Sequence, residues 1–299
     1  MSKNLKKKAL LPVIAMVLVS VVALSSATYA WFTTGNDATI NNLNVQVVAA
    51  DGIQISVDGT NWTSSLDTAA LSDIAAIQAA GYTGVVNQLP AGQVNPVSTA
   101  GIVADGKMQM FTGTLDGSGN LTTAADVETA GTNGNFIAFD VFFKMDSNKT
   151  IKLAYNGSQV IAGATDTDAE TAVRVAFIDL GNAATAANAR SLNTAASTKI
   201  WEPNAGVRSA AALAQFAEPQ NGQKLTYNGV KEAGANIGDS QKQQVETFAM
   251  AADTEILSLE KGYNKVRIYI WMEGEDIDCL NGTSGGVFNT TLKFVAPEA

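Results

Sequence analysis

Apolar and polar residues alternate along several short stretches of the chain, which is the pattern of strands with one buried face. In residues 266–273 four apolar residues alternate with arginine, tyrosine, tryptophan and glutamate, which predicts one such strand. Two apolar runs within residues 40–57 are separated by Ala-Asp-Gly, which predicts two strands and a tight turn. Residues 139–143 are almost continuously apolar and predict a central strand. That strand is expected over residues 136–145, and further strands over residues 151–155, 172–180 and 287–295.

Other stretches lack this alternation. Residues 66–80 are rich in alanine, carry apolar residues at helical spacing and are followed by Gly81, which predicts a helix and its end. Residues 205–216 and 241–250 have weaker helical patterns. The segments 84–135 and 181–240 are rich in Gly, Asn, Thr and Ala with little periodicity, and they predict long irregular loops.

Short strands joined by turns, without regular alternation of strands and helices, favour an antiparallel sandwich. We therefore expect a mainly β protein, an antiparallel two-sheet β-sandwich with short helices in long loop insertions. The strands before and after the insertions share one pattern. Residues 31–299 are accordingly expected to form a single β-sandwich domain, with insertions at about 60–135 and 181–250.

The amino-terminal segment has the layout of a secretory signal peptide. Lysines at positions 3, 6, 7 and 8 precede an apolar run over residues 9–24 and then small and polar residues. Small residues allow cleavage after Ala27 or after Ala30; the second site is preferred and makes Trp31 the mature amino terminus. The alternative is an uncleaved membrane anchor, because the apolar run approaches the about 20 residues that span a bilayer. The chain is thus expected to meet a signal peptidase and to be secreted or held at the cell surface.

Composition excludes several classes of function. The sequence has no histidine, so catalytic triads that use an imidazole base and the helical zinc-protease motif are excluded. Its single cysteine, Cys279, cannot form an intramolecular disulfide. The net charge is −9 and no basic patch follows the signal segment, so nucleic acid is not an expected partner. We expect no enzymatic activity.

Two oxygen-rich groups have spacing that could serve calcium. Asp166, Asp168 and Glu170 alternate in one loop, and a Gly-rich turn carries Asp116, Ser118 and Asn120. Neither group completes an EF-hand loop, which also needs a central glycine and a bidentate glutamate. Solvated turn residues are the preferred interpretation and no cofactor is expected, with calcium kept as the alternative.

The densest acidic cluster consists of Glu273, Glu275, Asp276 and Asp278. The paired carboxylates of glycosidases come from different strands rather than from one loop. This cluster is therefore interpreted as a solvated loop or a weak calcium site.

Three tryptophans, Trp62, Trp201 and Trp271, could stack against sugars if they shared one face. They lie far apart in the sequence, and aromatic residues in sandwiches usually belong to a core or an interface. Core or interface positions are the preferred interpretation.

Residues 27–33, Ala-Thr-Tyr-Ala-Trp-Phe-Thr, resemble the signal-peptide junction of the TasA/camelysin family, biofilm-fibre proteins of Gram-positive bacteria that the signal peptidase SipW processes. In that family a Thr-aromatic-Ala cleavage site is followed at once by aromatic residues. Residues 266–279 and 285–288 look like the final strands of exported proteins with the same kind of signal. The resemblance covers the two ends of the chain and leaves its middle half unmatched.

The resemblance implies a jelly-roll-like sandwich whose mature amino-terminal segment adds as a strand to a neighbouring subunit. The residues for this role are Ile40, Leu43, Val45 and Val47, which follow a polar leader over residues 33–39. The alternative is that this segment is the first strand of its own sandwich. Camelysin-like proteins have been classed as metallopeptidases, but a chain without histidine and without a zinc motif does not inherit that activity.

The expected function is that of an exported structural protein of the cell surface or extracellular matrix, a fibre-type subunit. Its expected partner is itself or a homologous surface protein. The alternative, from a different class, is a secreted or membrane-anchored binding module for glycans or a surface partner, acting through the segments 84–135 and 181–240.

Overall fold

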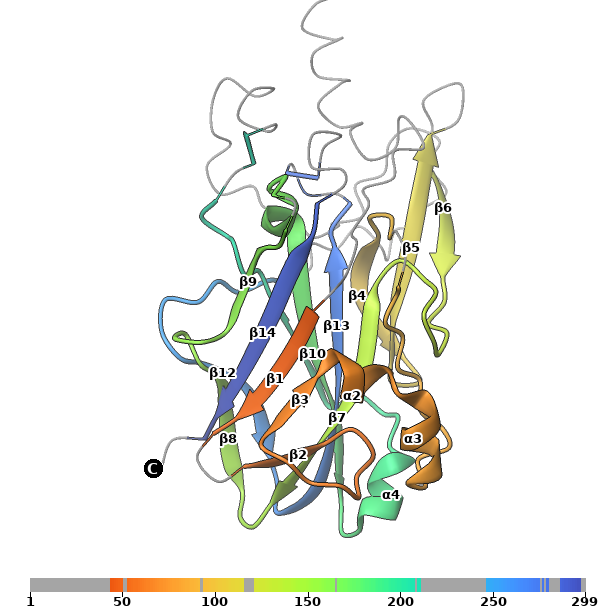
Figure 1. Cartoon of the computed structure of the whole chain (residues 1–299), viewed down its shortest axis with the longest axis vertical. Coiled ribbons are helices and arrows are strands. Elements are labelled where there is room, and N and C mark those ends of the chain that lie inside the picture. Colours follow the sequence, from red (N-terminus) through yellow and green to blue (C-terminus); the bar gives the residue numbers. More distant parts are fainter. Residues whose placement is uncertain are drawn as a thin grey trace, which may run out of the picture.

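A computed structural model describes residues 44–50, 53–91, 94–115, 121–164, 166–207, 209–210, 246–274, 276, 278–279 and 286–296. This part of the chain is mainly β, and its strands form three sheets (Figure 1). The expected β-sandwich with few helices is confirmed.

The first sheet has the strand order β12-β8-β14-β1-β3, and β9 also pairs with β14. Along β14 buried and half-buried residues alternate at every position, so one face of this sheet packs into the interior. All its pairings are antiparallel except that of β1 with β14, which is parallel. Its strands are β1 (Asn44–Ala49), β3 (Ser65–Asp67), β8 (Lys149–Leu153), β9 (Gln159–Ala162), β12 (Thr254–Leu259) and β14 (Phe288–Val295).

The second, central sheet has the order β11-β10-β13-β7-β2 and is antiparallel throughout. Its strands are β2 (Gln54–Ser56), β7 (Ile137–Met145), β10 (Val173–Ala183), β11 (Ser197–Trp201) and β13 (Gly262–Met272). In β7 every residue except Lys144 is buried, as the apolar run over residues 139–143 predicts. The alternation in residues 266–273 predicts a strand with one buried face, and this is wrong: Arg267, Tyr269 and Trp271 are buried as well.

The third sheet explains why the second face of β13 is covered. It is antiparallel, with the order β4-β5-β6, and consists of β4 (Ser98–Ala104), β5 (Lys107–Leu115) and β6 (Leu121–Asp126). The prediction of a long irregular loop over residues 84–135 is therefore wrong. The turn between β4 and β5 is Asp105-Gly106, with φ of 51° and 71°. Positive φ at both central residues is the geometry of a type I′ hairpin turn, for which Asp-Gly is a strong signal.

Two apolar cores separate these three layers. The larger core lies between the first and central sheets and contains side chains such as Phe139, Phe177 and Phe294. The smaller core lies between the central and third sheets, where Met108 and Trp271 are among its members. The molecule is thus a two-sheet sandwich with a third, smaller sheet packed on the back of its central sheet.

Helices are short and lie at the ends of strands: α2 (Thr68–Ser72), α3 (Ile74–Ala79), α4 (Ala186–Arg190) and the 3₁₀ helix η1 (Ala169–Ala172). The helix expected over residues 66–80 is two helices, because Asp73 ends α2 and its side chain caps α3 by accepting from the Ala76 N–H. In the described part of the helix expected over 241–250, residues 246–250 are not helical. No helix among the described residues is both long and apolar enough to cross a membrane.

Candidate functional site

The expected assembly strand falls partly within the described chain. Val45 and Val47 lie in β1, which pairs with β14 on one side and with β3 on the other. Their side chains are 2% and 0% exposed and belong to the larger core. Asn44–Ala49 is therefore an internal strand of its own sandwich. Ile40 and Leu43 lie outside the described residues, as do the cleavage-site residues Ala30 and Trp31.

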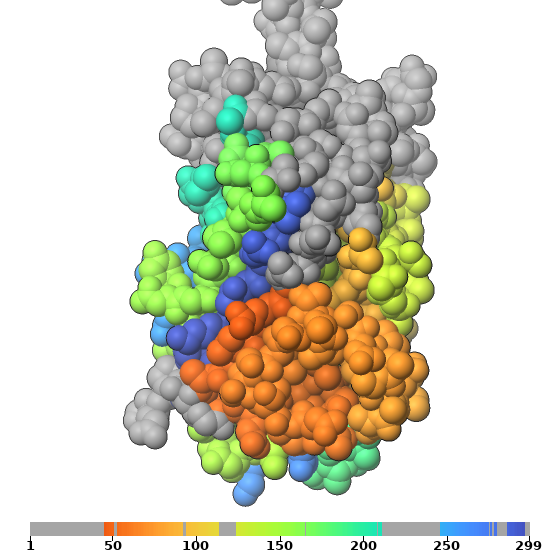
Figure 2. Space-filling model, in the orientation of Figure 1, coloured from red at the N-terminus to blue at the C-terminus, as the bar shows by residue number. Residues whose placement is uncertain are grey.

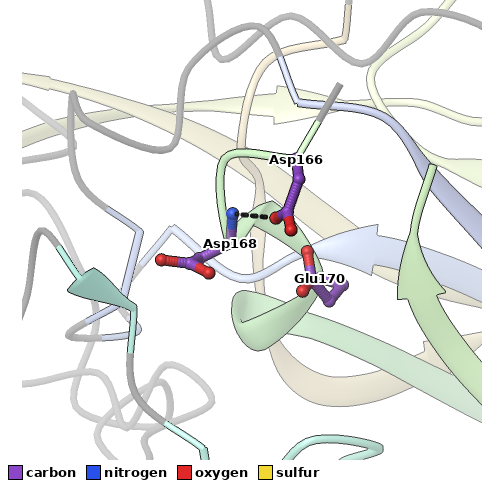
Figure 3. A group of neighbouring side chains, drawn as sticks. All are labelled: Asp166, Asp168 and Glu170. Carbon is purple, nitrogen blue, oxygen red and sulfur yellow. Dashed lines mark hydrogen bonds between the residues drawn. The ribbon is translucent and has the colours of Figure 1, made fainter. Parts of the chain in front are cut away.

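Asp166, Asp168 and Glu170 are brought together between β9 and β10 (Figure 3). One carboxylate oxygen from each lies within 4.8 Å of those of the other two. The backbone N–H of Asp168 donates to Asp166 Oδ1 at 3.2 Å, and Asp168 Oδ2 accepts from the Ala210 N–H at 2.7 Å. The sequence spacing therefore does correspond to a spatial cluster, and within it Asp168, with φ of 60°, is the left-handed residue that precedes η1.

The electrostatics of this acidic cluster centre on Glu170. Burial raises the pKa of Glu170 above its ordinary range, and the charges of Asp166 and Asp168 raise it further. Its Oε2 atom is buried without a hydrogen-bond partner. Three carboxylates at this distance repel one another, and they are also the hard oxygen ligands that calcium accepts. The second oxygen-rich group, Asp116, Ser118 and Asn120, lies outside the described residues.

The acidic cluster at the end of β13 is not a solvated loop, so that interpretation is wrong. Glu273, Asp276 and Asp278 are 0%, 4% and 0% exposed, while Glu275 lies outside the described residues. Glu273 accepts from the Ser98 hydroxyl and from Trp271 Nε1, the latter at 3.0 Å. These carboxylates are held inside the protein, where an ionised group requires hydrogen bonds or an opposite charge.

Arg174 of β10 supplies the opposite charge for this buried group. Its side chain is fully buried, forms an ion pair with Asp276 and lies with Nη2 3.6 Å from Glu202 Oε1. The sequence contained a signal for this pairing, because Arg174 interrupts an apolar strand. A charged residue at such a position needs a buried partner.

The three tryptophans do not form a sugar-stacking platform. Trp201 and Trp271 are buried on opposite faces of the central sheet, one in each core. Trp62 is half-buried and packs against Tyr263, with ring centroids 5.7 Å apart. The interpretation of these residues as core is confirmed for Trp201 and Trp271.

A second buried ionic group, which the sequence analysis missed, lies between the central and third sheets. Arg267 of β13 forms a bidentate pair with Asp140 of β7, with Nε–Oδ1 at 2.7 Å and Nη2–Oδ2 at 2.9 Å. Lys265 Nζ lies 3.4 Å from Asp140 Oδ2, and the Tyr82 hydroxyl donates to the same carboxylate. Burial raises the pKa of Asp140, but the charges of Arg267 and Lys265 and these hydrogen bonds outweigh it and lower the pKa to about 2.

This group also holds the third sheet in place. Arg267 Nη1 donates to the Gly106 carbonyl at 3.2 Å, in the turn between β4 and β5. The Met108 N–H of β5 donates to the Tyr269 hydroxyl at 3.0 Å, and that hydroxyl donates to Glu128. Burial raises the pKa of Glu128 even though the charge of Arg267 opposes the shift. The strongly shifted groups thus tie two sheets together.

Comparison with models of protein families, with curated proteins and with solved structures gave no match. The function is therefore argued from the residues of this chain.

Proposed function

We propose that the chain is an exported structural protein of the cell surface or extracellular matrix, which associates with its own copies through the mature amino-terminal segment. The observation that carries the proposal is that charged residues are buried and paired with one another inside the fold. Arg267 pairs with Asp140 and reaches the third sheet at the Gly106 carbonyl, while Glu273, in the buried group around Arg174, accepts from Ser98 of β4. These side chains serve as internal cross-links, which is what a rigid, chemically inert subunit requires.

The signal segment and the residues behind it support the export and assembly parts of the proposal. Cleavage after Ala30 leaves residues 31–43 in front of β1. Because Val45 and Val47 are built into their own sandwich, the segment offered to a neighbour is residues 31–43, with Ile40 and Leu43 as its apolar side chains. Main-chain hydrogen bonds would give affinity, and the side chains of Ile40 and Leu43, which face opposite sides of an extended strand, would give register.

The test compares two variants of the mature chain 31–299. In Ile40→Asp/Leu43→Asp the apolar residues of the segment become charged, whereas the control Asn41→Asp/Asn42→Asp adds the same charge and keeps them. Size-exclusion chromatography with light scattering and negative-stain electron microscopy should find fibres or large oligomers for the mature chain and the control. The first variant should remain folded and form neither fibres nor large oligomers.

A mature chain that forms no fibres or large oligomers at high concentration would end the assembly proposal. The intact mass of the protein recovered from cells and from medium tests export separately. A mass that begins at Trp31 supports cleavage, and a membrane-held chain that keeps its first 30 residues would favour the anchored binding module instead.

A further inference from the structure

The margins of the sheets differ in how well they are protected against pairing with another chain. An edge strand exposes unpaired N–H and C=O groups unless a bulge, a charge, a short length or a covering segment blocks them. The β2 margin is closed, because Ile55 and Thr63 exchange two backbone hydrogen bonds of 2.9 Å and so join the central sheet to the segment that enters β3. At β11, Phe248 pairs with the backbone of Ile200 and Glu202, and the open half of that strand carries Lys199.

Three more edges are protected by other means. In β9, the Val160 carbonyl accepts from Asn204 Nδ2 at 3.1 Å. In β12 the register shifts between Glu255 and Leu257, and in β4 it shifts between Thr99 and Val103. Bulges of this kind bend a strand and end regular pairing along its edge.

Within the described part of the chain, the edge strand β6 carries no bulge, and its one charge, Asp126, lies at its last residue. It pairs with β5 in an unbroken register from Met110↔Asp126 to Leu115↔Leu121, and its sequence Leu-Thr-Thr-Ala-Ala-Asp contains no lysine, proline or glycine. Ala124 and Ala125 are exposed, and Val127 just beyond is 70% exposed. Figure 1 shows β6 as the outermost strand of its sheet, and its yellow-green atoms reach the margin of the molecule in Figure 2. Within the described chain, its backbone bonds run only to β5.

We propose that β6 is a dimerisation edge, which pairs antiparallel with β6 of a second copy of this chain. The single charge of β6 is compatible with a second copy of the strand and sets the orientation in which the two copies pair. Asp126 is the only charged residue of β6 and accepts from Asn135 Nδ2 of its own chain at 2.9 Å. An antiparallel pair centred on Ala124 sets Asp126 opposite Thr122 of the second copy, whereas a parallel pair in register would set the two aspartates side by side.

Such a pair has two-fold symmetry and closes on itself, so that two three-stranded sheets become one of six strands. The interface is small, because six residues from each copy supply it, and it falls below the area of about 1,000 Å² that stable complexes usually bury. We therefore expect a weak dimer that forms only at high protein concentration. The dimer is independent of residues 31–43 and would link fibres sideways where these exist.

The first test places charge on the edge. Ala124→Lys/Ala125→Lys adds two lysines at exposed positions of β6, and Ser258→Lys adds one at an exposed position of the bulged edge β12. Each is made in the mature chain 31–299 and again in the Ile40→Asp/Leu43→Asp background, so that fibre formation cannot hide the dimer. Sedimentation velocity from about 10 μM to 1 mM should show dimers that the β6 variant weakens at least about tenfold and that Ser258→Lys leaves unchanged.

The second test locates the two-fold axis. With Cys279 replaced by serine, single cysteines are placed at residues 122, 123, 124 and 125, and at Ser258 as the control. Mild oxidation should yield the most disulfide-linked dimer at position 123 or 124, where antiparallel pairing sets a residue opposite itself, and little at 258. The proposal is overturned by a protein that is monomeric at 1 mM, by dimers that survive the two lysines, or by cross-linking at 258 that equals the cross-linking at both 123 and 124. A mature chain that forms the β6 dimer but no fibres would overturn the proposed function and leave the dimer proposal standing.

Discussion

The two faces of the central sheet are packed by different means, although the same strands supply both. In β13, Ile268 points into the larger core against the first sheet and is completely buried among apolar side chains. Its neighbour Arg267 points to the opposite face, where it pairs with Asp140 and donates to the Gly106 carbonyl of the third sheet. One face is thus held by apolar burial, and the other by apolar burial combined with ionic contacts.

This difference shows how a chain of low charge can attach an extra layer in one fixed position. Apolar contacts are non-directional and tolerate changes of equal volume. A buried bidentate pair has a fixed geometry, and losing one partner leaves an uncompensated charge. We call the face of the central sheet that carries Arg267 and Asp140 the ionic face. We therefore expect the larger core to tolerate conservative substitution and the ionic face to tolerate very little.

The largest effect is expected from Arg267→Met, which keeps most of the side-chain volume and removes the charge. Asp140 would stay buried with only Lys265 and Tyr82 beside it, so the free energy of unfolding should fall by about 3–5 kcal/mol. On the opposite face, Ile268→Val should lower it by only about 0.5–1.5 kcal/mol. Urea unfolding at pH 7 measures both, and equal losses would contradict the comparison.

The pH dependence of the Arg267→Met variant sharpens this test. The pKa of Asp140 is lowered from 3.8 to about 2 in the folded protein, so the pair stabilises the fold fully above pH 3.8. That stabilisation is lost as the pH falls from 3.8 towards 2. The stability difference between the wild type and Arg267→Met should therefore narrow over this window, and it should also shrink at pH 7 when Asp140→Asn is added.

How much of this could be predicted depends on which face is considered. The apolar residues of β13 and β7 predict strands, and these strands build the larger core as expected. The ionic face was missed because Arg267 alternating with apolar residues has the pattern of a solvent-exposed face. Its partner Asp140 is distant in the sequence, and only the pairing of β13 with β7 brings the two together.

The third sheet was missed for a different reason. Its strands are rich in threonine, alanine and glycine and give weak periodicity, yet the Asp105-Gly106 turn is a local signal that could have revealed the first hairpin. One of the two acidic clusters was predicted correctly from the sequence. Asp166, Asp168 and Glu170 lie close in the sequence, so their spacing was enough to predict that they meet.

An intermediate effect is expected from Gly106→Ala, at the turn that joins the ionic face to the third sheet. Gly106 has φ of 71°, and an added Cβ would lie 2.8 Å from the Asn193 carbonyl oxygen. The strain of this conformation and the close contact should together lower the free energy of unfolding by about 1–3 kcal/mol. The control is Gly181→Ala, where φ is 98° and nothing lies within 4 Å of the added Cβ. A loss at Gly106 no larger than that at Gly181 would show that the contact with Asn193 is unimportant.

The smallest effect is expected at the cluster of Asp166, Asp168 and Glu170, which belongs to neither buried ionic group. Glu170→Gln removes one of three repelling carboxylates, so in the presence of a chelator at pH 7 it should raise the free energy of unfolding by less than about 1 kcal/mol. The sign follows from the pKa of Glu170, which is raised from 4.5. The unfavourable contribution is complete above the folded-state pKa and disappears below pH 4.5, so the advantage of the variant should vanish in acid.

Calcium separates the two interpretations of this cluster. If the three carboxylates bind calcium, adding the ion should raise the melting temperature of the wild type more than that of Glu170→Gln. The wild type would then become the more stable of the two proteins. If they are turn residues without a ligand, calcium should change neither protein. The exposed Glu255→Gln on β12 is the matched control, because it removes the same charge away from the cluster. A response to calcium that all three proteins share would reflect screening of the net charge of −9 rather than binding at Asp166, Asp168 and Glu170.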